Sequence, residues 1–183
     1  MRRLVFISLV LVGLALPAAA LAHVFGPSDG TLVVRNADNG DGAAVAQNVR
    51  PVVSLVITGF AIGHVDSGRI EIYDLDPQDD ATPEVTSADS HKDVTHNFGD
   101  PVGTLTGTRW SGSTFSFRAA DGQYRILIYG SGVYLFAGGK GNVWLTGNPT
   151  APLADGSYSL NGDPWHSLTD TGKSGLAIAA ANG

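Results

Sequence analysis

The chain has 183 residues, a formal net charge of −6 and no cysteine. This length suits a single domain with a sizeable core. The lack of cysteine excludes disulfides, thiolate metal sites and a cysteine nucleophile. The acidic balance argues against a nucleic-acid partner or an anionic membrane surface.

The N-terminus has the order of regions that is typical of a secretory signal peptide. Arg2 and Arg3 are basic, an apolar run extends from Leu4 to Leu16, and Ala20-Leu21-Ala22 places small residues where a signal peptidase cleaves. The apolar run is shorter than the about 20 residues of a membrane helix, so a retained anchor is the less favoured alternative. We therefore expect cleavage after Ala22, one exported domain over residues 23–183, and no membrane span after cleavage.

Short apolar runs bounded by Gly, Asp, Asn and Pro predict β-strands in the remainder of the chain. In residues 69–73, Ile70 and Ile72 fall on one face while Arg69 and Glu71 fall on the other, as in a half-buried strand. Residues 52–58 are so uniformly apolar that we expect both faces to be covered. The predicted strands lie at residues 31–35, 52–58, 69–73, 114–118, 124–129, 133–137, 142–146, 157–160, 165–168 and 176–179.

Three glycine-containing segments are predicted to be hairpin turns between neighbouring strands. They are Asp121-Gly122, Gly138-Gly139-Lys140-Gly141 and Asn161-Gly162. Asp-Gly and Asn-Gly pairs accept the positive φ angles that tight hairpin turns need. Pro164 has no backbone N–H to donate, so the strand that follows it should lie at an edge or begin after it.

About eight strands with short connections and no crossover helix predict an all-β fold. We favour an antiparallel β-sandwich over a partly closed β-barrel, because several strands are apolar on both faces. The segment from Asp74 to Asp100 is long, polar and acidic. Such a segment in a compact domain is often functional or mobile.

Four segments resemble, in the same order, those of a group of secreted actinobacterial all-β proteins. They are Gly30-Thr31-Leu32-Val33-Val34-Arg35-Asn36, Gly68-Arg69-Ile70-Glu71-Ile72-Tyr73-Asp74-Leu75-Asp76-Pro77, Gly130-Ser131-Gly132-Val133 and Gly156-Ser157-Tyr158-Ser159-Leu160-Asn161-Gly162-Asp163-Pro164-Trp165. The resemblance implies export and a β domain, and it implies neither an activity nor any site residue.

Catalytic signatures are absent from the sequence. Tyr129-Gly130-Ser131-Gly132 lacks the first glycine of a nucleophile elbow, and Gly172-Lys173-Ser174 lacks the first glycine of a phosphate-binding loop. We therefore expect a non-catalytic binding or cell-surface module, with a cell-wall glycan or a surface protein as its partner. The alternatives are a hydrolase, or a calcium-dependent glycan-binding protein, built on the acidic loop at residues 74–80.

Trp165 is the candidate ligand-binding residue. It follows Pro164 close to the Asn161-Gly162 turn, where we expect exposure, and a flat aromatic ring stacks on the apolar face of a sugar. The alternative role is a structural plug over the end of the core. By contrast, Trp144 stands between Val143 and Leu145 and is expected to be covered.

We expect no cofactor, and calcium is the alternative that residue spacing favours. Asp74, Asp76, Asp79 and Asp80 fall within seven positions, and Pro77 bends the chain between them. Carboxylates in one loop can converge on a cation that takes six to eight oxygen ligands. The alternative is a series of ordinary solvated turns.

A copper site is a weaker hypothesis that depends on where the chain is cleaved. After cleavage, His23 would carry a free amine beside its imidazole, and the two groups together can chelate copper. The site would need a second histidine, for which the candidates are His64, His91, His96 and His166. The alternative is a frayed first residue with solvated loop histidines.

Overall fold

The computed structural model describes residues 26–37, 50–146, 156–168 and 175–180. The predicted signal peptide and His23 lie outside the described residues, and so does the proposed copper chelate. The described part contains eight antiparallel strands and no α-helix, which confirms the all-β prediction. The strands are β1 (Gly30–Ala37), β2 (Val53–Asp74), β3 (Glu84–Thr86), β4 (Ser90–Asn97), β5 (Thr104–Leu145), β6 (Ser157–Leu160), β7 (His166–Ser167) and β8 (Leu176–Ile178). None of the described residues form a helix with the length and apolar character needed to cross a membrane.

The long strand β2 winds back on itself instead of running straight. Leu55 and Ile72 stand near opposite ends of β2, yet both pair with Ile126 of β5. They therefore lie two strand spacings apart, or about 10 Å. A straight strand, which rises about 3.3 Å per residue, would carry them more than five times further apart. Between these two positions β2 completes a full turn.

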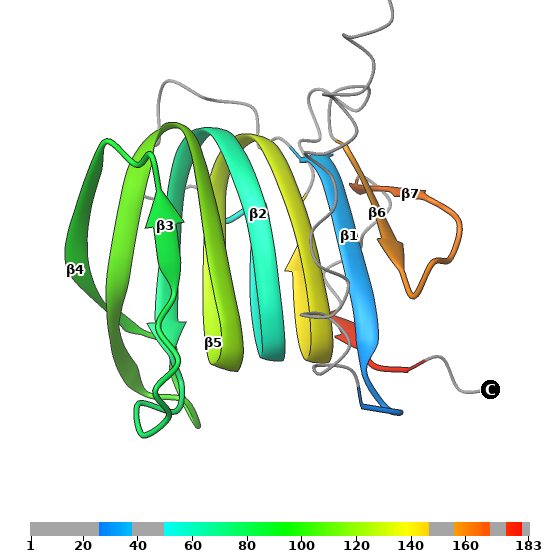
Figure 1. Cartoon of the computed structure of the whole chain (residues 1–183), viewed down its shortest axis with the longest axis horizontal. Coiled ribbons are helices and arrows are strands. Elements are labelled where there is room, and N and C mark those ends of the chain that lie inside the picture. Colours follow the sequence, from blue (N-terminus) through cyan, green and yellow to red (C-terminus); the bar gives the residue numbers. More distant parts are fainter. Residues whose placement is uncertain (1–25, 38–49, 147–155, 169–174, 181–183) are drawn as a thin grey trace, which may run out of the picture.

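The bends divide β2 and β5 into two facing layers, and the ribbons arch from one layer to the other in Figure 1. The first layer, here called the Tyr73 layer, contains residues 53–58, 69–74, 104–111, 123–129 and 140–145 with β4 and β8. The second layer, here called the Tyr134 layer, contains residues 60–67, 113–119 and 131–138 with β1, β3, β6 and β7. Each layer ends in edge strands, so the protein is a sandwich and not a closed barrel.

Glycines stand where the chain passes between the layers. Gly59 pairs with Gly122 and Gly139, and Gly68 pairs with Gly112 and Gly130. The φ angles of Gly59 and Gly68 are 141° and 148°, a region that residues with a Cβ avoid. A Cβ on Gly68 would also overlap the carbonyl oxygen of Tyr129. These bends therefore require glycine for both conformation and close backbone approach.

The predicted hairpin at Asp121-Gly122 is wrong. Phe117 already has partners in β2 and β3 on its two sides, and Tyr124 has two partners in β2. The flanking segments therefore do not pair with each other. Asp121 does have the expected positive φ, 60°, but this conformation carries the chain from one layer to the other. The same local backbone serves a tight turn or a bend, and long-range pairing selects between them.

The predicted hairpin at residues 138–141 is wrong for the same reason, whereas the third is confirmed. Leu135 pairs with β1 and β2, and Val143 pairs with β2 and β8, so the two segments belong to different layers. At the third site β6 pairs with β7. Asn161 and Gly162 have φ angles of 52° and 78°, and the Asp163 N–H donates to the Leu160 carbonyl at 2.8 Å.

The main core fills the space between the layers, and both layers supply it. Its largest fully buried apolar side chains include Leu32, Leu55, Ile57, Ile70, Phe115, Ile126 and Ile128. A smaller apolar cluster covers the outer face of the Tyr73 layer, where Tyr73, Leu127 and Tyr129 pack with Val94, Phe98 and Leu105.

This second cluster corrects the prediction of a half-buried strand at residues 69–73. Ile70 and Ile72 face the main core as expected, but Glu71 and Tyr73 on the opposite face are also buried. The prediction for residues 52–58 needs the opposite correction, because both faces were expected to be covered. Val53, Leu55 and Ile57 are buried, whereas Thr58 is exposed, so only one face of this strand is fully covered.

Candidate functional site

The indole of Trp165 is exposed, as predicted, and the side chain of Arg35 in β1 contacts it. Its exposed fraction is 45%. The guanidinium carbon of Arg35 lies over the ring, 4.1 Å from the centroid. A cation above an aromatic face is attracted by the ring quadrupole. Trp165 is therefore fixed beside β1 although nearly half of it contacts solvent.

Arg35, which contacts Trp165, lies on the outer face of the Tyr134 layer. His64 pairs directly with Tyr134, and Val34, next to Arg35, pairs with Leu135. The next row of this face is apolar, because Phe136 pairs with Val33 on one side and Ile62 on the other. The residues of these two rows are here called the Tyr134 face: Val33, Arg35, Ile62, His64, Tyr134 and Phe136.

Alternation along the strands explains why these side chains share one face. Val133 and Leu135 point into the core, so Tyr134 must point outward. Tyr134 is 43% exposed. Phe136, also on the outside, is held by Phe60, whose ring meets it edge-on with 5.3 Å between centroids. Aromatic side chains on the solvent side of a strand are the signal that the sequence analysis missed.

The Tyr134 face lines a shallow, mainly apolar cavity of about 450 Å³. Its border carries polar groups. The Nε2 of His64 lies 2.6 Å from the Asp66 carboxylate, and Ser116 lines the cavity beside His64. The His64 ring also contacts Tyr134, with 6.2 Å between ring centroids. The site thus offers flat aromatic surface with hydrogen-bonding groups beside it.

The carboxylates of the acidic loop are engaged in local turns. Asp74 accepts a hydrogen bond from the Asp76 N–H at 2.9 Å, and Asp79 accepts one from the Ala81 N–H at 2.9 Å. Asp76 accepts a longer bond, 3.4 Å, from the Gln78 N–H. In each case the donor stands two residues after the acceptor, which is the pattern of an Asx-turn. The aspartate spacing is therefore consistent with consecutive turns.

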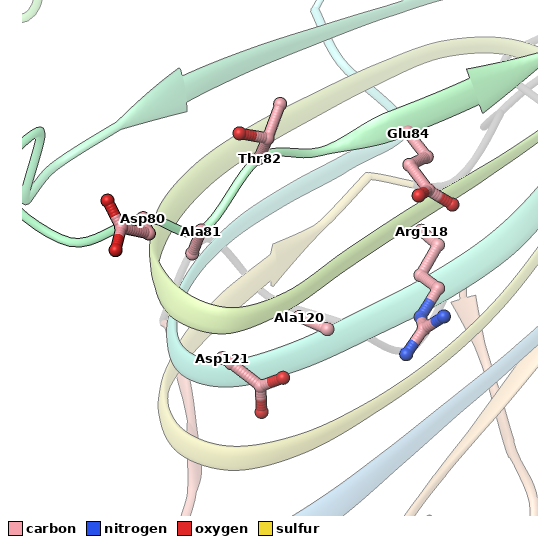
Figure 2. A pocket seen from close by; sticks show the side chains of 7 residues that line it. All are labelled: Asp80, Ala81, Thr82, Glu84, Arg118, Ala120 and Asp121. Carbon is pink, nitrogen blue, oxygen red and sulfur yellow. The ribbon is translucent and has the colours of Figure 1, made fainter.

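Two of the predicted calcium ligands line cavities at the end of the sandwich. Asp80 lines a cavity of about 440 Å³ together with Glu84, Arg118 and Asp121, and the Asp80 and Asp121 carboxylates point in different directions (Figure 2). Asp79 lines a neighbouring cavity of about 460 Å³ with Asp29, Asp121 and Lys140.

Asp74 and Asp76 line neither of these cavities. Within the described ranges, no three His, Asp or Glu side chains form a group that could hold a metal ion. The calcium hypothesis stays a prediction, and the described loop does not gather its four carboxylates around one point.

Trp144 differs from its prediction, because 38% of it is exposed. Val143 and Leu145 are buried in the main core, so strand alternation directs Trp144 to the outer face of the Tyr73 layer. It therefore lies on the side of the sandwich opposite the Tyr134 face. Its neighbours were apolar because they fill the core, which says nothing about the face that Trp144 occupies.

Comparisons with models of known protein families, with curated proteins and with solved structures found no match for this chain.

Proposed function

We propose that this chain is an exported, non-catalytic binding module that holds a glycan on the Tyr134 face, with Trp165 at its border. The observation that supports this proposal is the exposure of two large aromatic side chains, Tyr134, which lines the shallow apolar cavity, and Trp165, which contacts Arg35 of the cavity lining. Large aromatic side chains usually bury most of their surface, because their contact with water is unfavourable.

A sugar ring fits the chemistry of this face. The C–H groups of a pyranose form an apolar surface that stacks on an aromatic ring, while its hydroxyls require hydrogen-bonding partners. Arg35 offers donors, and the His64–Asp66 pair offers an acceptor, next to Tyr134. The cavity volume of about 450 Å³ is within the range of small-molecule sites.

The scaffold favours binding because it orders the site in advance. Arg35, His64 and Tyr134 stand on three neighbouring strands of one layer, and Phe60 holds Phe136 from the side. Little conformational entropy is lost when such a surface takes up a ligand.

The sequence supports export through the signal-peptide pattern of residues 1–22 and the resemblance to secreted proteins. Mass spectrometry of protein recovered from the medium tests this part, and we expect the mature chain to begin at His23. Protein that stays with the cells and retains residues 1–22 would overturn the proposal of export.

Binding to purified cell-wall fractions and to soluble oligosaccharides tests the glycan proposal. We expect Trp165→Ala and Tyr134→Ala each to weaken binding about tenfold, the scale of one lost stacking contact. Trp144→Ala is the matched control, since Trp144 is a similarly exposed tryptophan on the other layer. It should leave glycan binding unchanged.

Two results would oppose the proposal. If Trp165→Ala lowers the melting temperature cooperatively while glycan binding is unchanged, Trp165 is a structural plug. If the wild-type protein cleaves glycans in a panel of hydrolase substrates, the hydrolase alternative is favoured.

A further inference from the structure

The opposite side of the sandwich carries a compact group of cationic side chains. Strand pairing aligns Glu71, Arg109 and Lys92 across three neighbouring strands of the Tyr73 layer. The next row holds Arg69, Ser111 and Ser90 in the same way. Between the two rows lies a cavity of about 330 Å³, lined by Gly68, Arg69, Ser90, His91, Lys92, Arg109 and Ser111.

The charges around this cavity are not balanced within the described residues. Arg69, Lys92 and Arg109 are cationic, and no carboxylate lines the cavity. The carboxylate paired with the arginines is Glu71, which is 1% exposed and lies beneath them. Glu71 therefore pairs with two of the three cations, on a chain whose overall net charge is −6. Like charges held this close repel one another unless a counter-charge is present.

The hydrogen bonds of Glu71 leave one arginine donor unused. Arg109 directs its Nε and one terminal nitrogen at Oε1 of Glu71, at 2.9 and 2.7 Å. Tyr73 donates to Oε2 at 2.8 Å. The Nε of Arg69 is 3.4 Å from Oε1 but is not aligned for a hydrogen bond, so it is a buried donor without an acceptor. Such a donor carries a free-energy cost, and it shows that Glu71 does not satisfy both arginines.

Both guanidinium groups are held in position before any ligand binds. Arg69 lies over the ring of Tyr129, with its guanidinium carbon 3.9 Å from the centroid, and it is only 14% exposed. Arg109 is fixed by its two contacts to Glu71. Planar guanidinium groups suit carboxylate, phosphate and sulfate oxygens, and fixed donors lose little entropy on binding.

We propose that this cavity binds an oxyanion, the carboxylate, phosphate or sulfate group of an anionic ligand. Arg69 and Arg109 donate hydrogen bonds to it, Lys92 adds charge from the strand beside them, and the hydroxyls of Ser90 and Ser111 supply neutral donors. Glu71 is a positioning residue, which orients Arg109 from below. The cavity and the Tyr134 face belong to opposite layers, so each can be tested without the other.

Calorimetric titration of the mature protein with acetate, inorganic phosphate and inorganic sulfate tests this proposal. We expect saturable binding of one anion per chain, which weakens as sodium chloride is added because salt screens exposed charges. The anion that binds most tightly identifies the oxyanion that the ligand carries. Absence of binding by all three anions at low ionic strength would overturn the proposal.

Two variants separate a built site from general attraction of anions. Lys92→Gln changes an exposed side chain and should weaken anion binding about tenfold, while Arg109→Lys keeps the charge but removes the forked donor and should have a similar effect. Lys140→Gln is the matched control, since Lys140 is an exposed lysine of the same layer outside this cavity. Equal loss of affinity in Lys92→Gln and Lys140→Gln would contradict the assigned site. The melting temperature of each variant shows that it is folded.

Discussion

Tyr73 donates its phenolic hydrogen to Oε2 of Glu71, 2.8 Å away on the same face of β2, and both side chains are buried. Residues two apart in a strand share a face, so this contact forms within one strand. Burial raises the pKa of Tyr73 well above its usual value, and the hydrogen bond and charge of Glu71 raise it further. The pair connects the outer apolar cluster to the arginines of the cationic cavity.

Glu71→Gln should destabilise the protein by about 3 kcal/mol, because it removes the one buried counter-charge of Arg69 and Arg109. Equilibrium unfolding in urea measures the change. Glu84→Gln is the control, since Glu84 is exposed, and it should change the free energy of unfolding by less than about 0.5 kcal/mol. Similar losses in both variants would mean that the buried ion pair does not stabilise the fold.

Stability should fall at alkaline pH because three buried tyrosines resist ionisation. Burial, followed by the charges of Asp79, Asp74 and Asp121, raises the pKa of Tyr124 to about 12. Burial also raises the pKa of Tyr73 and of Tyr129. The unfolded chain releases these protons near the usual pKa of about 10, whereas the folded protein keeps them.

The stabilisation is therefore complete below about pH 10 and is lost as the pH rises towards the folded pKa, by about 1.4 kcal/mol per pH unit for each tyrosine. Urea unfolding at several alkaline pH values should show this slope. Tyr124→Phe should reduce it. If the tyrosinate absorbance of the native protein shows all five tyrosines ionising near pH 10, the prediction fails.

Gly68→Ala should destabilise the protein by at least about 3 kcal/mol or prevent folding, since a Cβ would strike the backbone of Tyr129 at a φ of 148°. Gly162→Ala is the matched comparison. Gly162 also has a positive φ, 78°, but no atom lies within 4 Å of its added Cβ. Gly162→Ala should therefore lower the free energy of unfolding by about 1 kcal/mol, the cost of backbone strain alone. Thermal unfolding of the two variants measures the difference, and equal shifts would show that the bend at Gly68 has room for a side chain.

Millimolar calcium should leave the melting temperature unchanged, because Asp74, Asp76 and Asp79 accept hydrogen bonds from their own loop and do not converge. Calorimetry on chelator-treated protein tests this expectation, with Asp76→Asn as the paired variant. If Asp74, Asp76, Asp79 and Asp80 bind calcium, the melting temperature of the wild type will instead rise with the logarithm of the calcium concentration. The Asp76→Asn variant will then lose that rise.

Local chemistry in the sequence determined one turn, the exposure of Trp165 and most strand segments, but it missed β3, β4 and the first part of β5. Alternating side chains placed Ile70 and Ile72 on a core face, and Asn161-Gly162 formed the predicted turn. These predictions succeeded because they depend on properties of neighbouring residues. Period-two alternation and positive φ angles are fixed within a few residues of the chain.

Only the tertiary structure decided how the strands are arranged and which faces are covered. Asp121-Gly122 has the backbone of a turn, but both flanking segments pair with β2, so the chain bends between layers there. Tyr73 is buried because Phe98 and its neighbours cover an outer face that alternation marks as polar. Arg35, His64 and Tyr134 meet only through the pairing of three separate strands. Alternation states which residues share a face, whereas pairing between distant segments determines what lies against that face, and no local pattern in the sequence carries that information.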